Sequence, residues 1–189
     1  MSHYEELTLR NAGYVSNELQ QTIRGCRILI AGCGIGSTIA EAAVRIGFER
    51  FLLADADRVE PHNLNRQAYC RSDIGDLKVE ALARRICSIN PDARIATVTE
   101  YIGPGNAAEV VSSCDLVFDT IDFLDLNGIV SLHDEANRQS KPLISAVSAG
   151  WGAALMYFPP EGGISSLFRR IFGLGEEGPV ENASYVKHF

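Results

Sequence analysis

Polar and charged side chains are concentrated in one short segment that follows an apolar run. The segment DADRVEPHNLNRQ covers residues 55–67 and places Arg66 among amide side chains, and Lys78 follows twelve residues after Arg66. Arginine and lysine neutralise phosphate oxygens. Asp55 lies about 20 residues after a glycine-rich turn, where an acid can accept a hydrogen bond from a nucleotide ribose. The segment therefore indicates a binding site for a nucleotide.

The glycine-rich turn itself is a weaker signal. The sequence GCGIGS contains Gly32, Gly34 and Gly36 between an apolar run and a helical pattern. Glycine lets a phosphate approach free backbone N–H groups at the start of a helix, where the helix dipole favours negative charge. A tight turn that requires positive φ explains the same glycines without a ligand. The turn also lacks the third glycine of GxGxxG, so its spacing is short for a dinucleotide fingerprint. Asp55 does not distinguish NAD from ATP.

A further acidic side chain follows a later apolar run. DLVFDTID ends in Asp122, where a carboxylate can bind Mg²⁺ against the phosphates. The alternative interpretation is that Asp122 caps a helix that begins near residue 124. An NAD enzyme has no need for Arg66 and Lys78, whereas an ATP enzyme must neutralise the phosphate charge that builds up around the reacting centre.

Strands and helices that must position these residues alternate along the chain. Apolar runs predict strands at residues 27–32, 51–55, 93–99, 115–119, 141–147 and 152–158. Helical patterns cover residues 37–46, 78–89 and 125–139, with one or two more helices within 5–25. This alternation predicts an α/β fold with a Rossmann-like, doubly wound, mostly parallel sheet that has helices on both faces. Arg66 and Lys78 then lie on loops at the carboxyl end of the sheet, and we expect both side chains outside the core.

Composition argues against several classes of protein. The chain has 189 residues, of which 46% are hydrophobic and 22% charged, as expected for one domain with a sizeable core. The net charge of −7 and the absence of a Lys/Arg block argue against nonspecific binding to nucleic acid or membrane. The sequence has no apolar signal core and no apolar run of about 18 residues, so a cytoplasmic location is expected.

Five widely spaced cysteines form no CxxC pair, so neither a disulfide framework nor a zinc site is expected. They are Cys26, Cys33, Cys70, Cys87 and Cys114. We interpret all five as structural or incidental, and a thioester step is therefore not supported.

In four segments the chain resembles the ThiF/MoeB/HesA family, the bacterial relatives of ubiquitin-activating enzymes. The segments are GCGIGS, LADADRVEPHNLNRQ, IGDLKVEALARRICSINPDA and DLVFDTID, and the resemblance runs in order over about residues 10–158. It implies an adenylyltransferase that uses ATP and Mg²⁺ to activate a carboxylate as an acyl-adenylate. The substrate implied is the C-terminus of a ubiquitin-like or sulfur-carrier protein, or a peptide. A homodimer is also implied.

The same resemblance assigns roles to individual residues. The nucleotide-binding residues it implies are Gly32, Gly34, Gly36, Asp55, Asp57, Asn63, Arg66, Gln67 and Lys78. The catalytic residues it implies are Arg66, Lys78, Asp122 and Arg10. Asp122 would bind Mg²⁺, Lys78 would neutralise charge in the transition state, and Arg10 would reach into the partner's active site.

Some positions depart from the family pattern and keep other interpretations open. The glycine turn is one residue short, and Phe123 and Asn127 stand where the family often has Asn and Arg. These departures keep open the alternative of a non-catalytic nucleotide-binding or scaffold module. An NAD-dependent oxidoreductase is the remaining alternative, which Asp55 and the glycine turn allow, although no catalytic Tyr-x-x-x-Lys or His is evident.

The expected organisation has three parts. Residues 1–25 form an N-terminal helical arm, and residues 26–158 form the ThiF-type nucleotide-binding domain. Residues 159–189 form a tail, which we interpret as a shortened substrate-binding half. The tail contains the amphipathic segment SSLFRRIF and no cysteine, whereas many family members carry two CxxC pairs for zinc in this region.

Overall fold

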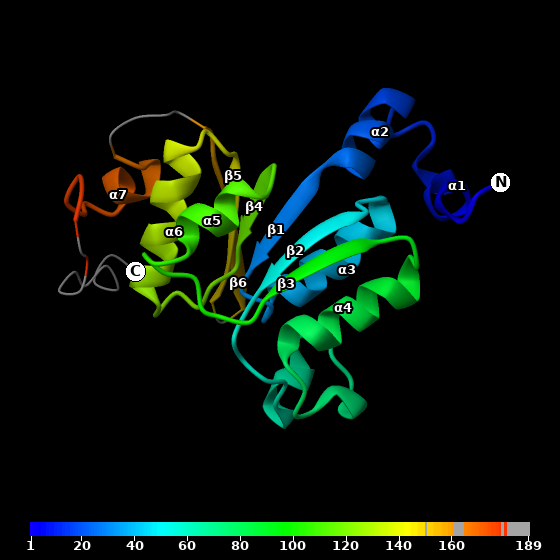
Figure 1. Ribbon diagram of the computed structural model, residues 1–189, viewed down its shortest axis with the longest axis horizontal. Helices are drawn as coiled ribbons and strands as arrows, with labels where there is room; N and C mark the ends of the chain where they lie inside the picture. Colours follow the sequence, from blue (N-terminus) through cyan, green and yellow to red (C-terminus); the bar gives the residue numbers. More distant parts are fainter. Residues whose placement is uncertain (150, 161–164, 179, 181–189) are drawn as a thin grey trace.

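A six-stranded sheet forms the centre of the described part of the molecule. The computed structural model describes residues 1–149, 151–160, 165–178 and 180. Within these residues, the strand order of the sheet is β3-β2-β1-β4-β5-β6 (Figure 1). The strands are β1 (Arg27–Ala31), β2 (Arg50–Ala54), β3 (Arg94–Val98), β4 (Leu116–Asp119), β5 (Leu143–Ala149) and β6 (Gly152–Phe158). Strands β1 to β5 pair in parallel and β6 is antiparallel to β5, which confirms the predicted doubly wound sheet.

Helices cover both faces of this sheet. They are α1 (His3–Thr8), α2 (Asn17–Gly25), α3 (Gly36–Ile46), α4 (Lys78–Ile89), α5 (Ala107–Ser112), α6 (Leu126–Arg138) and α7 (Leu167–Ile171). Three short 3₁₀ turns complete the described elements: η1 (Leu9–Asn11), η2 (Pro61–Asn65) and η3 (Arg71–Asp73). No helix in the described ranges is long and apolar enough to cross a bilayer.

The central strand β1 shows why its sequence is apolar at consecutive positions. Ile28, Leu29 and Ile30 are all fully buried. Ile28 and Ile30 belong to a core cluster with residues of α3 and α4, whereas Leu29 belongs to a second cluster with residues of α5 and α6. Neighbouring side chains of a strand point to opposite faces, so a strand covered on both sides must be apolar throughout.

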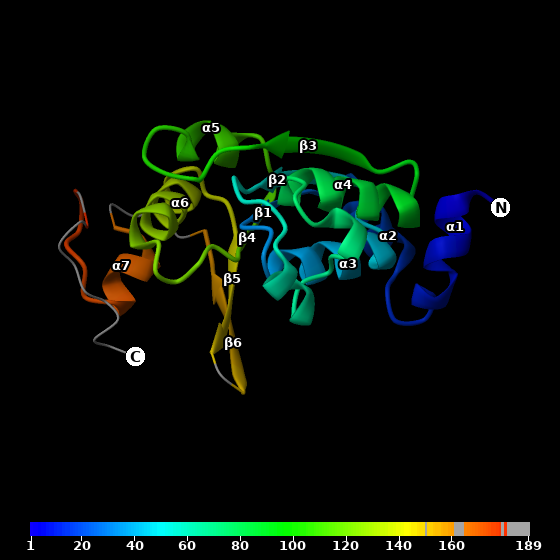
Figure 2. The ribbon, with the colours of Figure 1, turned by 90° about the horizontal axis from the view of Figure 1, so that it is seen from below.

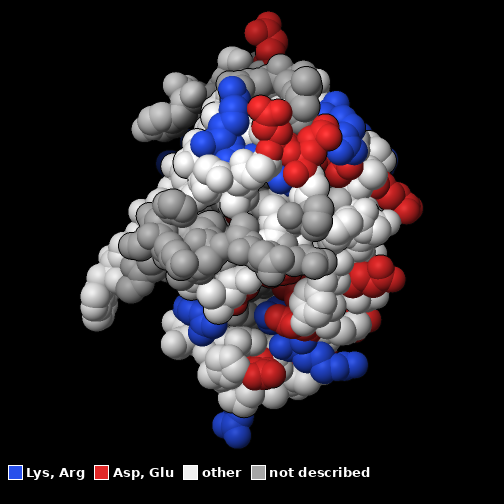
Figure 3. Space-filling model, turned by 90° about the vertical axis from the view of Figure 1, so that its left-hand side faces the viewer, with Lys and Arg blue, Asp and Glu red and all other residues white. Residues whose placement is uncertain are grey.

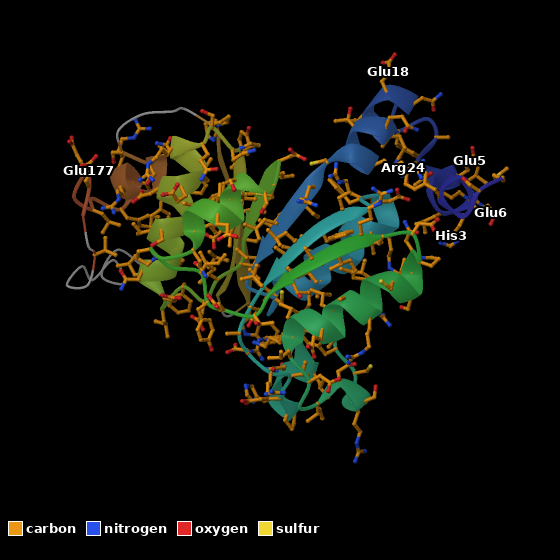
Figure 4. All side chains as sticks on the ribbon, viewed as in Figure 1. His3, Glu5, Glu6, Glu18, Arg24 and Glu177 are labelled. Atoms are coloured by element: carbon orange, nitrogen blue, oxygen red, sulfur yellow. The ribbon has the colours of Figure 1, made fainter. Side chains whose placement is uncertain are left out.

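The N-terminal arm is fastened to the ends of two helices. The Tyr4 hydroxyl donates to the carbonyl oxygen of Gly47, and the Asn11 amide donates to that of Ile46, at 3.1 and 3.0 Å. The His3 ring contacts the last carbonyl of α4, that of Ile89, at 3.0 Å. Carbonyls at helix C-termini have no partner within the helix, so these side chains satisfy them from outside. Figure 4 shows His3 and its neighbours in α1 at the side of the molecule opposite α7.

The tail begins by packing on its own domain. Phe168 of α7 is buried and lies 4.5 Å from the ring of His133 in α6. Arg169 is 4% exposed and donates to both carboxylate oxygens of Asp134, at 3.0 and 2.8 Å. On the face that contains α7, charges of both signs are interspersed (Figure 3). Residues 161–164, 179 and 181–189 lie outside the described part, and the interpretation of the tail as a shortened substrate-binding half stays a prediction.

Candidate active site

A cleft of about 720 Å³ lies at the carboxyl ends of the parallel strands. The strand order reverses between β1 and β4, and doubly wound sheets bind ligands in the crevice at this position. The predicted site residues that line the cleft are Gly32, Gly34, Asp55, Asp57, Asn63, Arg66, Gln67, Lys78 and Asp122. The structure thus brings together side chains from the loops after β1, β2 and β4.

The glycine turn packs directly against the end of β4. Gly32 has φ of +87°, and a Cβ atom at this position would lie 2.7 Å from the carbonyl carbon of Thr120. A Cβ atom on Gly36 would lie 2.7 Å from a methyl group of Ile30 and closer still to the Thr120 hydroxyl. Gly36 does not line the cleft, and the close packing of α3 against β1 explains why a glycine is required at this position. Its predicted nucleotide contact stays a prediction.

Asp55 connects the glycine turn to the polar loop. Its carboxylate accepts the backbone N–H groups of Cys33 and Asp57, each at 2.7 Å. Burial raises the pKa of Asp55, and the nearby Lys78 ammonium and the two N–H groups oppose that rise. Asp55 therefore fixes the relative position of the two loops, in addition to its predicted role toward a ribose.

Lys78 lies deeper than the sequence indicated. It is the first residue of α4 and is only 7% exposed, so the expectation that its side chain lies outside the core is wrong. The reason is that a lysine stem is apolar and can be buried while its ammonium reaches a polar partner. Here Nζ donates to Asp57 Oδ2 at 2.7 Å. Burial acts to raise the pKa of Asp57, but hydrogen bonds from Lys78 and Tyr101 prevail and hold it below its ordinary value.

The loop around η2 supplies a cation and two amides. Arg66 is exposed, and its Nη1 donates to the carbonyl oxygen of His62 at 3.1 Å and to Asn65 Oδ1 at 2.9 Å. Asn63 is buried and accepts the backbone N–H of Glu60 at 2.9 Å, so it holds the turn that carries Arg66.

Gln67 lines the cleft and carries a buried acceptor. Its Oε1 atom is buried and accepts no hydrogen bond from the part of the chain that the structure describes. Buried polar atoms are rarely left without a partner in folded proteins. The amide therefore requires a donor that these residues do not supply.

The sequence left two roles open for Asp122, as a Mg²⁺ ligand or as a helix cap, and the structure gives the helix cap to Asp125. The side chain of Asp125 caps α6 by accepting the N–H of Gly128 at 3.0 Å. Asp122 instead accepts the N–H of Leu124 at 3.0 Å, outside the helix, and is exposed at the cleft. The alternative that Asp122 caps this helix is therefore wrong, and its binding of Mg²⁺ stays a prediction.

A buried network supports the loop that carries Asp122. Asp119 Oδ2 lies 2.9 Å from both the Ser145 hydroxyl and the His133 ring nitrogen Nε2. Its other oxygen accepts the N–H of Ile121 at 3.2 Å. Asp119 therefore ties the start of this loop to β5 and α6.

Arg10 is not brought to this cleft. It lies on η1 in the N-terminal arm, is exposed, and does not line the cleft of its own chain. The arm contacts the C-terminal ends of α3 and α4, whereas the cleft lies at their N-terminal ends. The predicted contact of Arg10 with a partner's active site stays a prediction.

Sequence reasoning missed several residues that line the cleft. They include His62, Tyr101, Ile102, Thr120, Ile121, Phe123, Ala146 and Val147. Tyr101 follows β3 at the same edge of the sheet where Asp55 follows β2. The rule that ligands bind at carboxyl ends of parallel strands would have indicated Tyr101.

The fold and the cleft together define the class: a doubly wound α/β protein with a charged cleft where the strand order reverses between β1 and β4. The sequence model that describes the ThiF family matches residues 8–182 of this chain. The chain belongs to the ThiF family, which confirms the resemblance found in the sequence.

Two curated relatives illustrate the family. The tRNA threonylcarbamoyladenosine dehydratase of Escherichia coli (strain K12) is 34% identical over 133 residues, which are 69% of this chain and 49% of the relative. The sulfur carrier protein adenylyltransferase of Thermus thermophilus is 30% identical over 132 residues, which are 69% of this chain and 48% of the relative. The chain thus spans about half the length of these proteins.

The fold is also similar to solved structures. The crystal structure of E. coli tRNA N6-threonylcarbamoyladenosine dehydratase in complex with ATP aligns with a TM-score of 0.76 and 30% identity. The alignment covers 80% of this chain and 63% of that one. The same enzyme in complex with AMP aligns with a TM-score of 0.75.

Proposed function

We propose that this chain is an ATP-dependent adenylyltransferase that activates a carboxylate as an acyl-adenylate. The observation that supports this most directly is the convergence of Arg66, Lys78 and Asp122 with Asp55 in one cleft. Two cations beside a carboxylate that could hold a metal suit a polyphosphate better than a nicotinamide dinucleotide. The ATP and AMP complexes of the dehydratase from E. coli agree with this choice of nucleotide.

In the proposed reaction, a carboxylate oxygen of the substrate attacks the α-phosphorus of ATP. An O–P bond forms, the bond from the α-phosphorus to the bridging oxygen breaks, and pyrophosphate leaves with the electron pair. The attacking carboxylate is already ionised at neutral pH, so no general base is required. Arg66 and Lys78 would neutralise the charge that accumulates on the departing phosphates. Gln67 lines the cleft, so its side-chain amide could contact the bound nucleotide.

The residues at the cleft fit a magnesium ion held largely by the nucleotide. Mg²⁺ is commonly bound through one or two carboxylates, substrate phosphates and water. Asp122 supplies such a carboxylate at the cleft. Among the described residues, no group of three or more His, Cys, Asp or Glu could hold a metal. Asp122 would therefore hold the ion together with the phosphates, where it would offset their negative charge.

For the acyl substrate we favour the C-terminus of a small carrier protein or peptide. The β5–β6 hairpin projects beyond the other strands (Figure 2), and Leu155 and Tyr157 of β6 are exposed. Its strand β5 contributes Ala146 and Val147 to the cleft, so an extended segment along this hairpin would lead into the site. The net charge of −7 disfavours a tRNA substrate of the kind named for the E. coli dehydratase.

A homodimer is part of the same proposal. Arg10 lies at the end of the molecule away from its own cleft, so it could act on a nucleotide only in a second copy of the chain. Light scattering of Arg10→Ala and wild type tests the dimer, and mixed dimers test the site. A dimer of Arg10→Ala with Arg66→Ala should regain activity, because one of its two composite sites keeps both arginines.

The first experiment is isothermal calorimetry with ATP and Mg²⁺ against NAD⁺. Wild type should bind ATP, and Asp122→Asn should weaken the Mg²⁺-dependent part while it keeps the acceptor for the Leu124 N–H. NAD⁺ binding without ATP binding would contradict the proposal.

The second experiment is ATP–pyrophosphate exchange with a panel of carrier proteins, peptides and tRNA. Arg66→Ala should lower the exchange rate by about 10²–10³-fold. The control Arg71→Ala removes an exposed arginine of η3 that does not line the cleft. ATP binding without exchange for any substrate would favour the non-catalytic alternative, which Phe123 and Asn127 keep open.

A further inference from the structure

Tyr101 occupies an unusual position for an exposed residue. It follows β3 and lines the cleft, and it is 62% exposed. Its hydroxyl nevertheless donates a hydrogen bond to Asp57 Oδ1. Tyr101 is therefore connected to the charged groups of the site through its hydroxyl, although most of its surface faces solvent.

The loop that carries Tyr101 is held in place by one amide. The Asn106 side chain donates to the carbonyl oxygen of Tyr101 at 3.0 Å and accepts the N–H of Gly103 at 2.9 Å. These two hydrogen bonds close the loop between β3 and α5. The backbone of Tyr101 is thereby fixed, so its ring is presented to the cleft from a defined position.

Asp57 connects Tyr101 to Lys78. The second carboxylate oxygen of Asp57 accepts the Lys78 ammonium at 2.7 Å, and the side chains of Lys78 and Asp57 are 8% and 45% exposed. The backbone carbonyl of Asp57 also accepts the backbone N–H of Lys78 at 2.9 Å. A half-exposed carboxylate has freedom to rotate, and a second hydrogen bond on its other oxygen removes that freedom.

We propose that Tyr101 is a positioning residue whose hydroxyl fixes the Asp57 carboxylate and thereby holds the Lys78 ammonium in place within the cleft. This inference rests on the proposed function for its effect on activity, but the contact itself is independent of it. Tyr101 acts through Asp57 and does not need to touch the nucleotide. The hydrogen bond from the hydroxyl also partly offsets the negative charge of Asp57. The Asp57 carboxylate then attracts the Lys78 ammonium less strongly, and the ammonium is more available to a phosphate oxygen.

The protonation states agree with this geometry. The hydrogen bond to Asp57 raises the pKa of Tyr101 to about 12, so its hydroxyl remains a donor at neutral pH. The same hydrogen bond helps to hold the pKa of Asp57 below its ordinary value, together with the bond from Lys78 and against the effect of burial. The other titratable or charged groups that line the cleft around Asp57 are Asp55, His62, Arg66, Asp122 and Asp125.

The test compares Tyr101→Phe with wild type. The variant keeps the ring and loses only the hydroxyl, and at an exposed position it should fold normally. The first measurement is the ¹³C carboxyl resonance of Asp57, assigned with Asp57→Asn and followed over pH. We expect its titration to move to higher pH in Tyr101→Phe, because one of the two bonds that stabilise the ionised form is gone. Tyr14→Phe, at a residue 93% exposed in the N-terminal arm, is the matched control and should leave it unchanged.

The second measurement is the ATP–pyrophosphate exchange rate. Tyr101→Phe should lower kcat by about three- to tenfold, the range expected for one hydrogen bond, with a smaller change in KM for ATP. The acid limb of the activity profile should move to higher pH in parallel with the carboxyl titration.

Either measurement can overturn the inference. An Asp57 titration identical in wild type and Tyr101→Phe would refute it whatever the activity, as would unchanged exchange in an active enzyme. A shifted titration in a chain without any exchange activity would support the Tyr101–Asp57 contact and count against the proposed function, so the two failures are distinguishable.

Discussion

The contact between Gly32 and the end of β4 allows a quantitative prediction for Gly32→Ala. The alanine would have to adopt φ of +87°, and its Cβ atom would lie 2.7 Å from the carbonyl carbon of Thr120 and 2.9 Å from the nitrogen of Ile121. A left-handed conformation costs a non-glycine residue about 1–2 kcal/mol. Forcing a methyl group into backbone atoms costs about 1–3 kcal/mol more. We therefore expect the free energy of unfolding to fall by about 2–5 kcal/mol.

Gly13→Ala separates the two contributions. Gly13 has φ of +92°, and nothing lies within 4 Å of a Cβ atom built there. This variant should lose only the conformational part, about 1–2 kcal/mol. Urea unfolding followed by circular dichroism measures both losses. If Gly32→Ala costs no more than Gly13→Ala, the close approach of the turn to β4 is refuted.

The same substitution should also affect the cleft. The backbone shift that relieves the contact must move the glycine turn or the loop of residues 120–122, and both line the cleft. ATP affinity of the folded fraction of Gly32→Ala should therefore fall, whereas Gly13→Ala should bind normally. Normal binding by both variants would mean that the turn does not contribute to the nucleotide site.

Three further outcomes are expected. Asp134→Ala leaves the buried Arg169 guanidinium without its carboxylate, so the packing of α7 on α6 should weaken by about 3–5 kcal/mol. The tail should then become sensitive to limited proteolysis, and an unchanged cleavage pattern would contradict this. The pKa of Asp57 is held below its ordinary value, so the ionised carboxylate stabilises the fold above that ordinary value, and this stabilisation is lost as pH falls. In urea titrations, the stability advantage of wild type over Asp57→Asn should therefore shrink on acidification below about pH 4. A difference that stays constant with pH would refute this prediction. Cys70 is exposed, whereas burial raises the pKa of the Cys33 thiol, so iodoacetamide should modify Cys70 in the folded protein and Cys33 only after unfolding, as mass spectrometry would show; equal rates would contradict the burial of Cys33.

The long elements of the fold could be predicted from the sequence because their signals are local. The helix expected at residues 78–89 is α4, and the helix expected at residues 37–46 is α3, which ends at Gly47 in the left-handed conformation. In contrast, α5 was missed because its six residues are too few to establish a helical period.

The candidate site was predicted less completely, since its geometry depends on tertiary contacts. The polar loop indicated Arg66 and Asp55, but no local pattern shows that the Lys78 stem is buried or that its ammonium pairs with Asp57. Tyr101 lies 44 residues further along the chain than Asp57, and only the pairing of β2 with β3 brings the two loops together. Asp122 was considered as a helix cap because the helix was expected to begin near residue 124, whereas α6 begins at Leu126 and Asp125 caps it.

The arm and the cleft are joined by two shared helices. α3 begins at the glycine turn and α4 begins at Lys78, and the last turns of both helices are hydrogen-bonded to the arm. A helix bends little, so a tilt at one end of the helix also displaces its other end. Any movement of the glycine turn or of Lys78 on nucleotide binding should reach the arm, where Arg10 lies. In the proposed dimer, occupancy of one cleft would then alter the surface from which Arg10 would reach the second copy. Amide exchange in the arm should therefore report on a nucleotide bound at the opposite end of the sheet.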